Sequence, residues 1–322
     1  MDASEIELVR TSMRHLVTNY SPAELATQLL ESGWGDLLPT DAAVAIGVLA
    51  EEAGRSTTAG PMLDLVLQHG LGLQPDAATG VVLPPLARSV VETYAGRADG
   101  AVVVVNGLVL AGHERATRWL VATDAGVFSV EAGALTFRAA GAGDVALALR
   151  SVGGSATGSV LVASSEKWRS AVTLGRKAIA AELVGLAAQM LEDTVAYVNV
   201  RHQYGRPIGS FQTVKHRLAD VHVATVAARV GLATAWSDST DVSAMAALCL
   251  ATRAQQLAAT HCQQVHGGIA FTVEHGFHRF IRRGQLVGGL LGHPDDLLRT
   301  IGEALIERTS APRTPQLTLA PR

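Results

Sequence analysis

The chain of 322 residues is 48% hydrophobic and 17% charged, and its formal net charge is −3. This length allows two or three structural units, and the composition indicates a globular chain with a large core or apolar subunit interfaces. The small net charge and the lack of any basic run argue against a nucleic-acid partner.

The cysteines and the first residues indicate the compartment. Cys249 and Cys262 fall within helical apolar patterns, and neither has a CxxC or histidine neighbour at metal spacing, so we expect buried free thiols. The acidic start "MDASEIELVR" lacks the apolar core of a signal peptide. No stretch reaches the roughly 20 uninterrupted apolar residues of a membrane span. We therefore expect a cytoplasmic protein without membrane association.

Residues 1–75 are expected to form an N-terminal helical domain. Ser21 followed by Pro22 is typical of a helix start, because proline suits the first helical position, and it opens "SPAELATQLLES". Asp41 is a candidate cap for the next helical pattern, "DAAVAIGVLAEEAGRS", which Gly54 is expected to stop.

Residues 76–165 change to short valine-rich runs separated by Gly, Asn and Asp. The runs that share this pattern are "GVVLPPLA", "GAVVVVNGLVLAG", "RWLVATDAGVFSVEAGALTF" and "GSVLVAS". Such runs predict consecutive antiparallel strands, and hence a small, shortened middle β-domain. No strand alternates with a helix here and no GxGxxG turn occurs, which argues against a Rossmann unit.

Residues 166–309 return to helical spacing in three long stretches. These are "AIAAELVGLAAQMLEDTVAYVNVRHQY", "SFQTVKHRLADVHVATVAARVGLATAW" and "DVSAMAALCLATRAQQLAATHCQQV". Their wide, alanine-rich apolar stripes predict a C-terminal four-helix bundle. A last helix is expected at "HPDDLL", where Pro294 suits a helix N-terminus, and residues 310–322 are expected to be a disordered tail. The predicted fold class is α+β, mainly α.

This order of elements, with three local stretches, resembles the acyl-CoA dehydrogenase family of flavoenzymes. "RHQYGRPIGSFQTVKHRLAD" is similar to the family's Arg-x-x-Phe-Gly-x-x-Ile-x-x-x-Gln element, and "QQVHGGIAFTVEHGFHRFIRR" to its Gln-x-x-Gly-Gly element. "VLAEEAGRS" is similar to the family's Glu-Glu-x-Gly-Arg helix end. The resemblance covers essentially the whole chain, is strongest over residues 166–283, and implies an acyl-CoA dehydrogenase-like fold.

In this family the first two motifs hold the ADP half of an FAD that is usually bound mainly by the neighbouring subunit. The resemblance implies that Arg201 meets the pyrophosphate, assisted by Gln203, and that Gln212 caps the nucleotide portion. Tyr204 replaces the family's Phe and would lie against the cofactor or in the core. Close backbone approach is implied at Gln264, Gly267 and Gly268. Taken singly, Arg201 would more often be a solvated helix-end charge and the glycine pair a helix stop.

The catalytic base of the family has no counterpart in this sequence. Family members remove an α-proton with a glutamate, and counting from Gln264 places Leu291 at its usual position. A minority of members carry the glutamate on the helix before the arginine motif, where "LGRKAIAAELVG" has Gly175. Neither side chain can accept a proton. The stretch "VVLPPLARSVVETYAGRADG" also lacks the family's Thr-Glu-Pro strand and loop.

Two other side chains are candidates for an unusual base. Glu182 lies about 10 Å from Gly175 by helical rise. His293 is close to the Leu291 position and titrates in a suitable range. The neighbouring Asp295 and Asp296 are better explained as helix-start residues.

Three further residues could have a structural or a functional role. Arg176, which follows Gly175, would contact CoA or a subunit interface. His266, inside the Gly-Gly motif, is a common family variant and is expected to be structural. Trp119 is expected in the core rather than on a flavin-facing strand.

The resemblance implies the base-less subunit of a heteromeric α2β2 FAD-dependent acyl-CoA dehydrogenase, with two FADs per tetramer. The partner, a catalytic acyl-CoA dehydrogenase subunit, would carry the glutamate and most of the acyl-CoA site, and electrons would pass to an electron-transfer flavoprotein. Heteromers of this kind in actinobacterial steroid side-chain degradation suggest a steroid-CoA substrate. The alternatives are a self-sufficient homomeric dehydrogenase with an unusual base, and a binding or scaffold protein without flavin.

Overall fold

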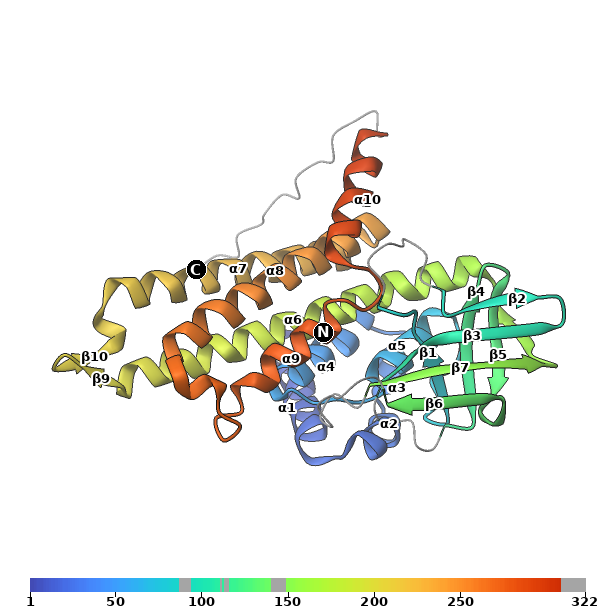
Figure 1. Cartoon of the computed structure of the whole chain (residues 1–322), viewed down its shortest axis with the longest axis horizontal. Coiled ribbons are helices and arrows are strands. Elements are labelled where there is room, and N and C mark those ends of the chain that lie inside the picture. Colours follow the sequence, from blue (N-terminus) through green and yellow to red (C-terminus); the bar gives the residue numbers. More distant parts are fainter. Residues whose placement is uncertain (87–93, 111, 113–115, 140–148, 308–322) are drawn as a thin grey trace.

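The computed structural model describes residues 1–86, 94–110, 112, 116–139 and 149–307, and it is mainly helical with a small β region (Figure 1). The N-terminal part contains five helices: α1 (Ala3–Asn19), α2 (Pro22–Glu31), α3 (Trp34–Leu37), α4 (Ala42–Ser56) and α5 (Met62–Gly70). They pack against the long helices that follow the β region, and one hydrophobic core runs through both groups. The expected order of helices, strands and long helices is confirmed.

Two of the predicted helix starts are present, and one predicted stop is wrong. Pro22 is the first residue of α2. The Asp41 carboxylate accepts a hydrogen bond from the backbone N–H of Val44 at 3.0 Å. Gly54, however, lies inside α4, which continues to Ser56. Its role is close packing, because a Cβ on Gly54 would lie 2.1 Å from the Glu182 carbonyl oxygen of the neighbouring helix.

The β region consists of two four-stranded sheets, with strand orders β1-β4-β5-β8 and β2-β3-β7-β6. The first sheet contains β1 (Thr79–Val82), β4 (Arg118–Thr123), β5 (Gly126–Glu131) and β8 (Val160–Ala163). The second contains β2 (Gly96–Asp99), β3 (Val102–Val109), β6 (Leu135–Ala139) and β7 (Arg150–Thr157), with the short helix η1 (Ala132–Ala134) before β6. Trp119 is buried between the sheets, 5.0 Å from the Phe137 ring, as expected for a core tryptophan.

One strand pair differs from the predicted antiparallel arrangement. β1 pairs with β4 in parallel, whereas the other strand pairs of the two sheets are antiparallel. The chain leaves the first sheet after β1 to form the β2–β3 hairpin of the second sheet, and then returns beside β1 in the same direction. A parallel pair needs such a long crossover, which short valine-rich runs do not reveal.

The C-terminal bundle is built on α6 (Ser165–Val200), α7 (Gln212–Asp238), α8 (Asp241–His266) and α9 (Phe277–Val287). α6 packs along α8 and α7, and α9 packs on α6 and α8, so the expected four-helix bundle is confirmed. The short elements at its ends are β9 (His202–Gln203), β10 (Arg206–Pro207), η2 (Ile208–Ser210) and η3 (Gly267–Phe271). The helix expected over residues 178–204 starts earlier, at Ser165, and ends at Val200.

The last helix, α10 (Pro294–Ile306), begins at Pro294 as predicted and extends away from the bundle (Figure 1). Cys262 is buried and Cys249 is half-buried, and both are free thiols. Burial raises the pKa of each thiol to about 11, so both are protonated at neutral pH. The tail predicted over residues 310–322, and residues 87–93 of the stretch that lacks Thr-Glu-Pro, lie outside the described residues.

α7 is the one helix of the described chain that is long and apolar enough to cross a membrane. It has 27 residues, and 28% of its most apolar window is buried. That test uses length and composition alone, and a bundle helix passes it too. α7 packs along α8, and its Arg229 pairs with Glu51 of α4 at 2.8 Å, which are the contacts of a bundle helix.

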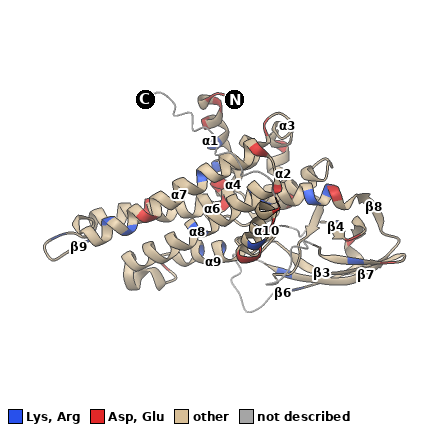
Figure 2. Cartoon of the chain, turned by 90° about the horizontal axis from the view of Figure 1, so that it is seen from above, with Lys and Arg blue, Asp and Glu red and all other residues tan. Residues whose placement is uncertain are grey.

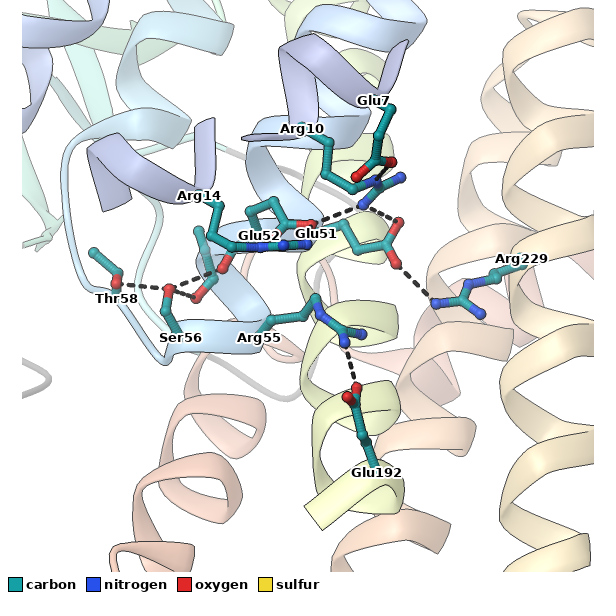
Figure 3. A network of polar contacts seen from close by, with 11 residues as sticks. Glu7, Arg10, Arg14, Glu51, Glu52, Arg55, Ser56, Thr58, Glu192 and Arg229 are labelled. Atoms are coloured by element: carbon teal, nitrogen blue, oxygen red, sulfur yellow. Dashed lines mark hydrogen bonds and ion pairs between the residues drawn. The ribbon is translucent and has the colours of Figure 1, made fainter. Parts of the chain in front are cut away.

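A charge network joins four helices that are distant in sequence (Figure 3). Glu52 of α4 is buried and accepts hydrogen bonds from Arg10 at 2.8 Å and Arg14 at 2.9 Å, both on α1. Burial alone would raise the pKa of Glu52, but these hydrogen bonds and the two positive charges lower it below its usual value. Arg55 pairs with Glu192 of α6. The Glu-Glu-x-Gly-Arg stretch therefore has a structural role in this chain.

Candidate functional site

The two motifs singled out in the sequence meet at one end of the bundle, where α6 ends, α7 begins and α8 ends (Figure 1). His266, the last residue of α8, places a ring nitrogen 3.1 Å from the Thr194 hydroxyl of α6. His261 of α8 places Nδ1 3.1 Å from the Arg217 carbonyl oxygen near the start of α7. Residues 201–212 and 264–268 are thus parts of one surface.

The arginine motif begins at the end of α6 and then forms a β-hairpin. Arg201 ends α6, and its carbonyl oxygen accepts a hydrogen bond from the Ile208 N–H at 2.8 Å. Tyr204 and Gly205 form the turn with φ of 52° and 75°, and this pair of positive φ angles fits a two-residue hairpin turn. The Arg206 guanidinium lies 4.2 Å from the Phe211 ring centroid and supports the base of the hairpin.

Polar groups of the hairpin remain available for another molecule. Arg201, Gln203 and Gln212 are exposed, and Tyr204 at the tip is 92% exposed. Within the part of the chain that the structure describes, the Arg201 guanidinium makes no hydrogen bond or ion pair. Tyr204 therefore lies outside the core of this chain.

The start of α7 makes this surface electropositive. No side chain caps the helix among the described residues, and its first turn contains no acidic residue. Lys215 and Arg217 lie in the first two turns of α7, and Figure 2 shows basic positions in blue near the β9 end of this helix. Unpaired N–H groups and the helix dipole favour an anion at such a helix start, and Gln212 is the first helical residue there.

The end of α8 contributes an open backbone surface. Gln264 is exposed, and Gly267 ends the helix with φ of 68°, a conformation that favours glycine. A Cβ on Gly267 or Gly268 would meet no described atom within 4 Å. Within this chain neither glycine is required by a packed neighbour, so the space beside Gly268 is free for another molecule.

His266 lies beneath this surface and is buried, as expected for a structural residue. Its ring stacks on Tyr197 with centroids 4.4 Å apart and meets His275 at 4.7 Å. Burial, and then the neighbouring His275, lower the pKa of His266 to about 4. The ring is therefore neutral near pH 7 and fixes the end of α8 against α6.

Gly175 and Leu291, the two positions predicted to lack the base, lie next to each other inside the core. A Cβ on Gly175 would lie 2.6 Å from Leu291 Cδ1, 3.0 Å from Leu67 Cδ2 and 3.5 Å from Leu63 Cδ1. Leu291 is 1% exposed. The volume around both base positions is therefore filled by leucine side chains, in addition to lacking a carboxylate.

Arg176 is held by this packed region. Its Nε donates to the Leu291 carbonyl oxygen at 3.0 Å, and its Nη1 donates to the Asp241 carboxylate at 2.7 Å. These contacts fix the start of α8 and the segment before α10 to α6. The contact of Arg176 with CoA or an interface stays a prediction, and the bonds seen here are structural.

The candidates for an unusual base also have structural partners. Glu182 accepts a hydrogen bond from the buried Arg283 Nε at 2.5 Å. His293 caps α10, with its Nδ1 3.4 Å from the Asp295 N–H. Asp295 and Asp296 lie in the first turn of α10, as expected for helix-start residues.

Sequence reasoning did not identify Leu63, Leu67 or Asp241. Asp241 is 65 residues from Arg176, and the leucines lie on α5, far from Gly175 in sequence. No local motif marks such contacts, because they depend on how α5 and α8 pack against α6. The sequence singled out Gly175 and Leu291, but it did not predict the leucine packing around them.

Comparisons with known proteins agree with this architecture. Residues 168–306 match the family model of the acyl-CoA dehydrogenase C-terminal domain. The chain is 43% identical over 123 residues to acyl-CoA dehydrogenase IpdE2 of Mycobacterium tuberculosis, which covers 38% of this chain and 39% of that protein. It is 40% identical over 135 residues to acyl-CoA dehydrogenase FadE34 of the same organism, covering 40% of this chain and 19% of that protein. These alignments span about two fifths of the relatives' length or less.

Solved structures resemble almost the whole chain. The Tcur3481-Tcur3483 steroid ACAD G363A variant superposes with a TM-score of 0.81 at 22% identity, covering 94% of this chain and 98% of that chain. The ChsE4-ChsE5 complex from Mycobacterium tuberculosis gives 0.79 at 22% identity, covering 96% and 99%. A glutaryl-CoA dehydrogenase from Mycobacterium smegmatis in complex with FADH2 gives 0.77 at 18% identity, covering 96% of each chain.

Proposed function

Since residues 168–306 belong to the acyl-CoA dehydrogenase family and the chain has the fold of these FAD-dependent enzymes, we propose that it is the base-less subunit of a heteromeric acyl-CoA dehydrogenase. The observation that carries this proposal is the leucine packing of Leu291, Leu67 and Leu63 around Gly175. A chain closed at both base positions cannot remove an α-proton there.

The exposed end of the bundle supports a binding role for this chain. Arg201 would hold the FAD pyrophosphate with charge-assisted hydrogen bonds, helped by Gln203 and by the start of α7. Gln212 would contact the nucleotide portion, and Gln264 would approach it from the end of α8. Gly268 would allow close backbone contact, since the space beside it is open, and Gly267 would contribute in the same way.

Apolar side chains around this end support a protein partner. Five of them are between 47% and 92% exposed: Val200, Tyr204, Ile269, Phe271 and Val273. Such a concentration of exposed apolar groups beside polar ligands is typical of an interface that another subunit covers. Tyr204 would then lie between the cofactor and that subunit.

In the proposed complex the partner would supply the glutamate and the flavin-ring pocket, and bound FAD would accept the hydride from the acyl-CoA. Arg201, Gln212 and Gln264 would only bind and orient. The proposal includes an α2β2 assembly in the cytoplasm, an electron-transfer flavoprotein as acceptor and a steroid acyl-CoA as substrate. The similarity to a steroid ACAD and to the ChsE4-ChsE5 complex supports the choice of a partner subunit and of a steroid substrate.

Co-expression with an acyl-CoA dehydrogenase encoded beside this chain tests the proposal. We expect a yellow complex with one FAD per pair of chains, which reduces a dye in the presence of acyl-CoA, and a colourless, inactive chain when it is purified alone. Flavin absorbance and native mass give the stoichiometry. Turnover by the lone chain would support the homomeric enzyme, and colourless protein in every combination would support a scaffold without flavin.

A further inference from the structure

A second polar pocket lies at the opposite end of α7 from the hairpin, where α7 meets α8. The 27 residues of α7 separate the two ends by about 40 Å, given the rise of an α-helix. The pocket has a volume of about 380 Å³, within the range of roughly 300 to 1,000 Å³ of small-molecule sites. Its polar lining is His69 from α5, Ser170, Thr173 and Lys177 from α6, and Ser239 and Asp241 from the α7–α8 connection.

Lys177 is the feature of this pocket that lacks an explanation within the chain. The residue is only 4% exposed, and its Nζ lies 4.8 Å from the Trp236 ring centroid. Across residues 1–86, 94–110, 112, 116–139 and 149–307, its ammonium forms no hydrogen bond and no ion pair. An ammonium carries three donors, and none of those of Lys177 is used within the described chain, although the residue lines the pocket.

The residue type also points to a ligand. Only three of the 26 basic residues are lysines: Lys167, Lys177 and Lys215. Burial lowers the pKa of Lys177, although the charge of Asp238 opposes this in part. A bound anion would raise this pKa again, whereas the cation–π contact with Trp236 leaves the ammonium donors unused.

We propose that this pocket binds the carboxylate or phosphate group of a small molecule through the ammonium of Lys177. The carboxylates nearby are already engaged. Asp241 accepts from Arg176 at 2.7 Å and from the Thr173 hydroxyl at 2.9 Å, and exposed Asp238 accepts from the Thr240 hydroxyl at 2.7 Å. Arg176 offsets the charge of Asp241, and Asp238, whose charge raises the pKa of Lys177, is not part of the pocket lining.

The hydroxyl groups complete a polar site for the rest of the ligand. Ser170 and Ser239 donate to helical carbonyl oxygens of Glu166 and Trp236, at 3.3 and 3.1 Å. A hydroxyl in this arrangement keeps its lone pairs for a donor on the ligand. The pocket therefore suits a molecule that has one oxyanion and also carries hydroxyl or amide groups.

Nuclear magnetic resonance of the full chain, labelled with ¹³C at the lysine Cε atoms, tests this site directly because few signals are present. Lys167→Met and Lys177→Met assign the signals. The chain is titrated at one pH with inorganic phosphate or succinate, and with sodium chloride of equal ionic strength. Phosphate and succinate distinguish a phosphate site from a carboxylate site by which of them saturates at lower concentration.

We expect a saturable shift of the Lys177 signal with one of the two anions and not with chloride. Lys177→Met is expected to weaken binding by roughly tenfold or more, while Lys167→Met leaves it unchanged. A Lys177 signal that follows chloride as Lys167 and Lys215 do overturns the proposal, whether or not Lys177→Met folds. The readout needs neither flavin nor partner, so it is independent of the proposed function.

Discussion

Arg176 lies within α6 and Arg201 lies at the C-terminal end of that helix, and the two side chains have opposite environments. Arg176 is 4% exposed, and its guanidinium binds Asp241 and the Leu291 carbonyl oxygen. Arg201 is exposed beside the uncapped start of α7, and its guanidinium has no partner among the described residues. Only Arg201 therefore has its five N–H donors available to a phosphate group.

Arg201→Ala in the co-purified complex is expected to weaken FAD binding. Loss of a charge-assisted hydrogen bond costs about 1.5–3 kcal/mol, which corresponds to a roughly 10- to 150-fold higher dissociation constant. Flavin retained after dialysis, and titration of the apo complex with FAD, measure the effect. Arg97→Ala is the matched control, because Arg97 is an exposed arginine in the β region. Equal flavin content in both variants would remove Arg201 from the site.

The packing around Leu291 would disfavour a carboxylate at that position. Leu291→Glu would put a carboxylate at a position that is 1% exposed and surrounded by leucines. We expect a loss of roughly 3 kcal/mol or more in the free energy of unfolding, and no acyl-CoA turnover by the lone chain. Leu298→Glu on α10, where the leucine is 55% exposed, should change stability by about 0.5 kcal/mol or less. Urea unfolding compares the two, and turnover by Leu291→Glu would contradict the closed site.

The helices α4 and α6 cross at two glycines. A Cβ on Gly54 would lie 2.1 Å from the Glu182 carbonyl oxygen, and one on Gly185 would lie 2.1 Å from the Glu51 carbonyl oxygen. The backbones are therefore in direct contact, which only glycine permits. This crossing fixes the N-terminal helices to the bundle.

Gly54→Ala is expected to destabilise the chain by about 2–4 kcal/mol, because the clash is with backbone that cannot rotate away. Gly47→Ala on the same helix is the control. Its Cβ would meet Trp236 Nε1 at an ordinary 3.8 Å, and alanine favours the helix by up to about 1 kcal/mol. Denaturant midpoints of the two variants should therefore move apart. Equal midpoints would show that the crossing tolerates a methyl group.

Much of the element pattern could be predicted from the sequence, and the exceptions have physical causes. The helix starts at Ser21, Asp41 and Pro294 depend on local capping, which the sequence encodes directly. The hairpin over residues 202–207 was not expected, since "RHQY" continues a helical pattern and only the Tyr-Gly turn interrupts it. The parallel pairing of β1 with β4 depends on a crossover between two sheets and has no local signal.

At the scale of the whole molecule, the charge network around Glu52 joins the first helix to the bundle. Arg10 and Arg14 bind Glu52, while Glu51 binds Arg229 of α7 (Figure 3). The pKa of Glu52 is lowered in the folded chain. Because the pKa of Glu52 is lower in the folded chain than in the unfolded chain, its stabilising effect is complete above the unfolded-state pKa of 4.5. The effect is lost as the pH falls through the folded-state pKa.

Glu52→Gln should lower the free energy of unfolding by about 2–3 kcal/mol at neutral pH, because two arginines lose a buried carboxylate. The difference in free energy of unfolding between the variant and the wild type should shrink below pH 4.5, as the Glu52 carboxyl of the wild type becomes protonated. Glu7→Gln is the control, since Glu7 is an exposed partner of Arg10 at 3.6 Å, and its effect should stay within about 0.5 kcal/mol. Unfolding followed at several pH values checks this, and a pH-independent difference would contradict the assignment.

The sequence predicted which exposed residues form the candidate site, but not how the core beneath them packs. Arg201, Gln212 and Gln264 could be identified because each motif is continuous in sequence. Their meeting at one end of the bundle required the helices to be long and antiparallel, which the apolar pattern indicates. The closure of Gly175 by Leu67 depends on α5, and the unpaired ammonium of Lys177 depends on which carboxylates come near. Such features arise only when the chain is packed.

The leucines around Gly175 also bear on how this chain can change over time. A glutamate introduced at position 175 requires Leu291 and Leu67 to move, and one introduced at position 291 replaces a side chain that is 1% exposed. Either substitution alone lowers stability before it provides any chemistry. In the proposed heteromer, a base at either of these packed positions would therefore be harder to gain by single substitutions than a change in the exposed residues proposed to bind the partner's FAD.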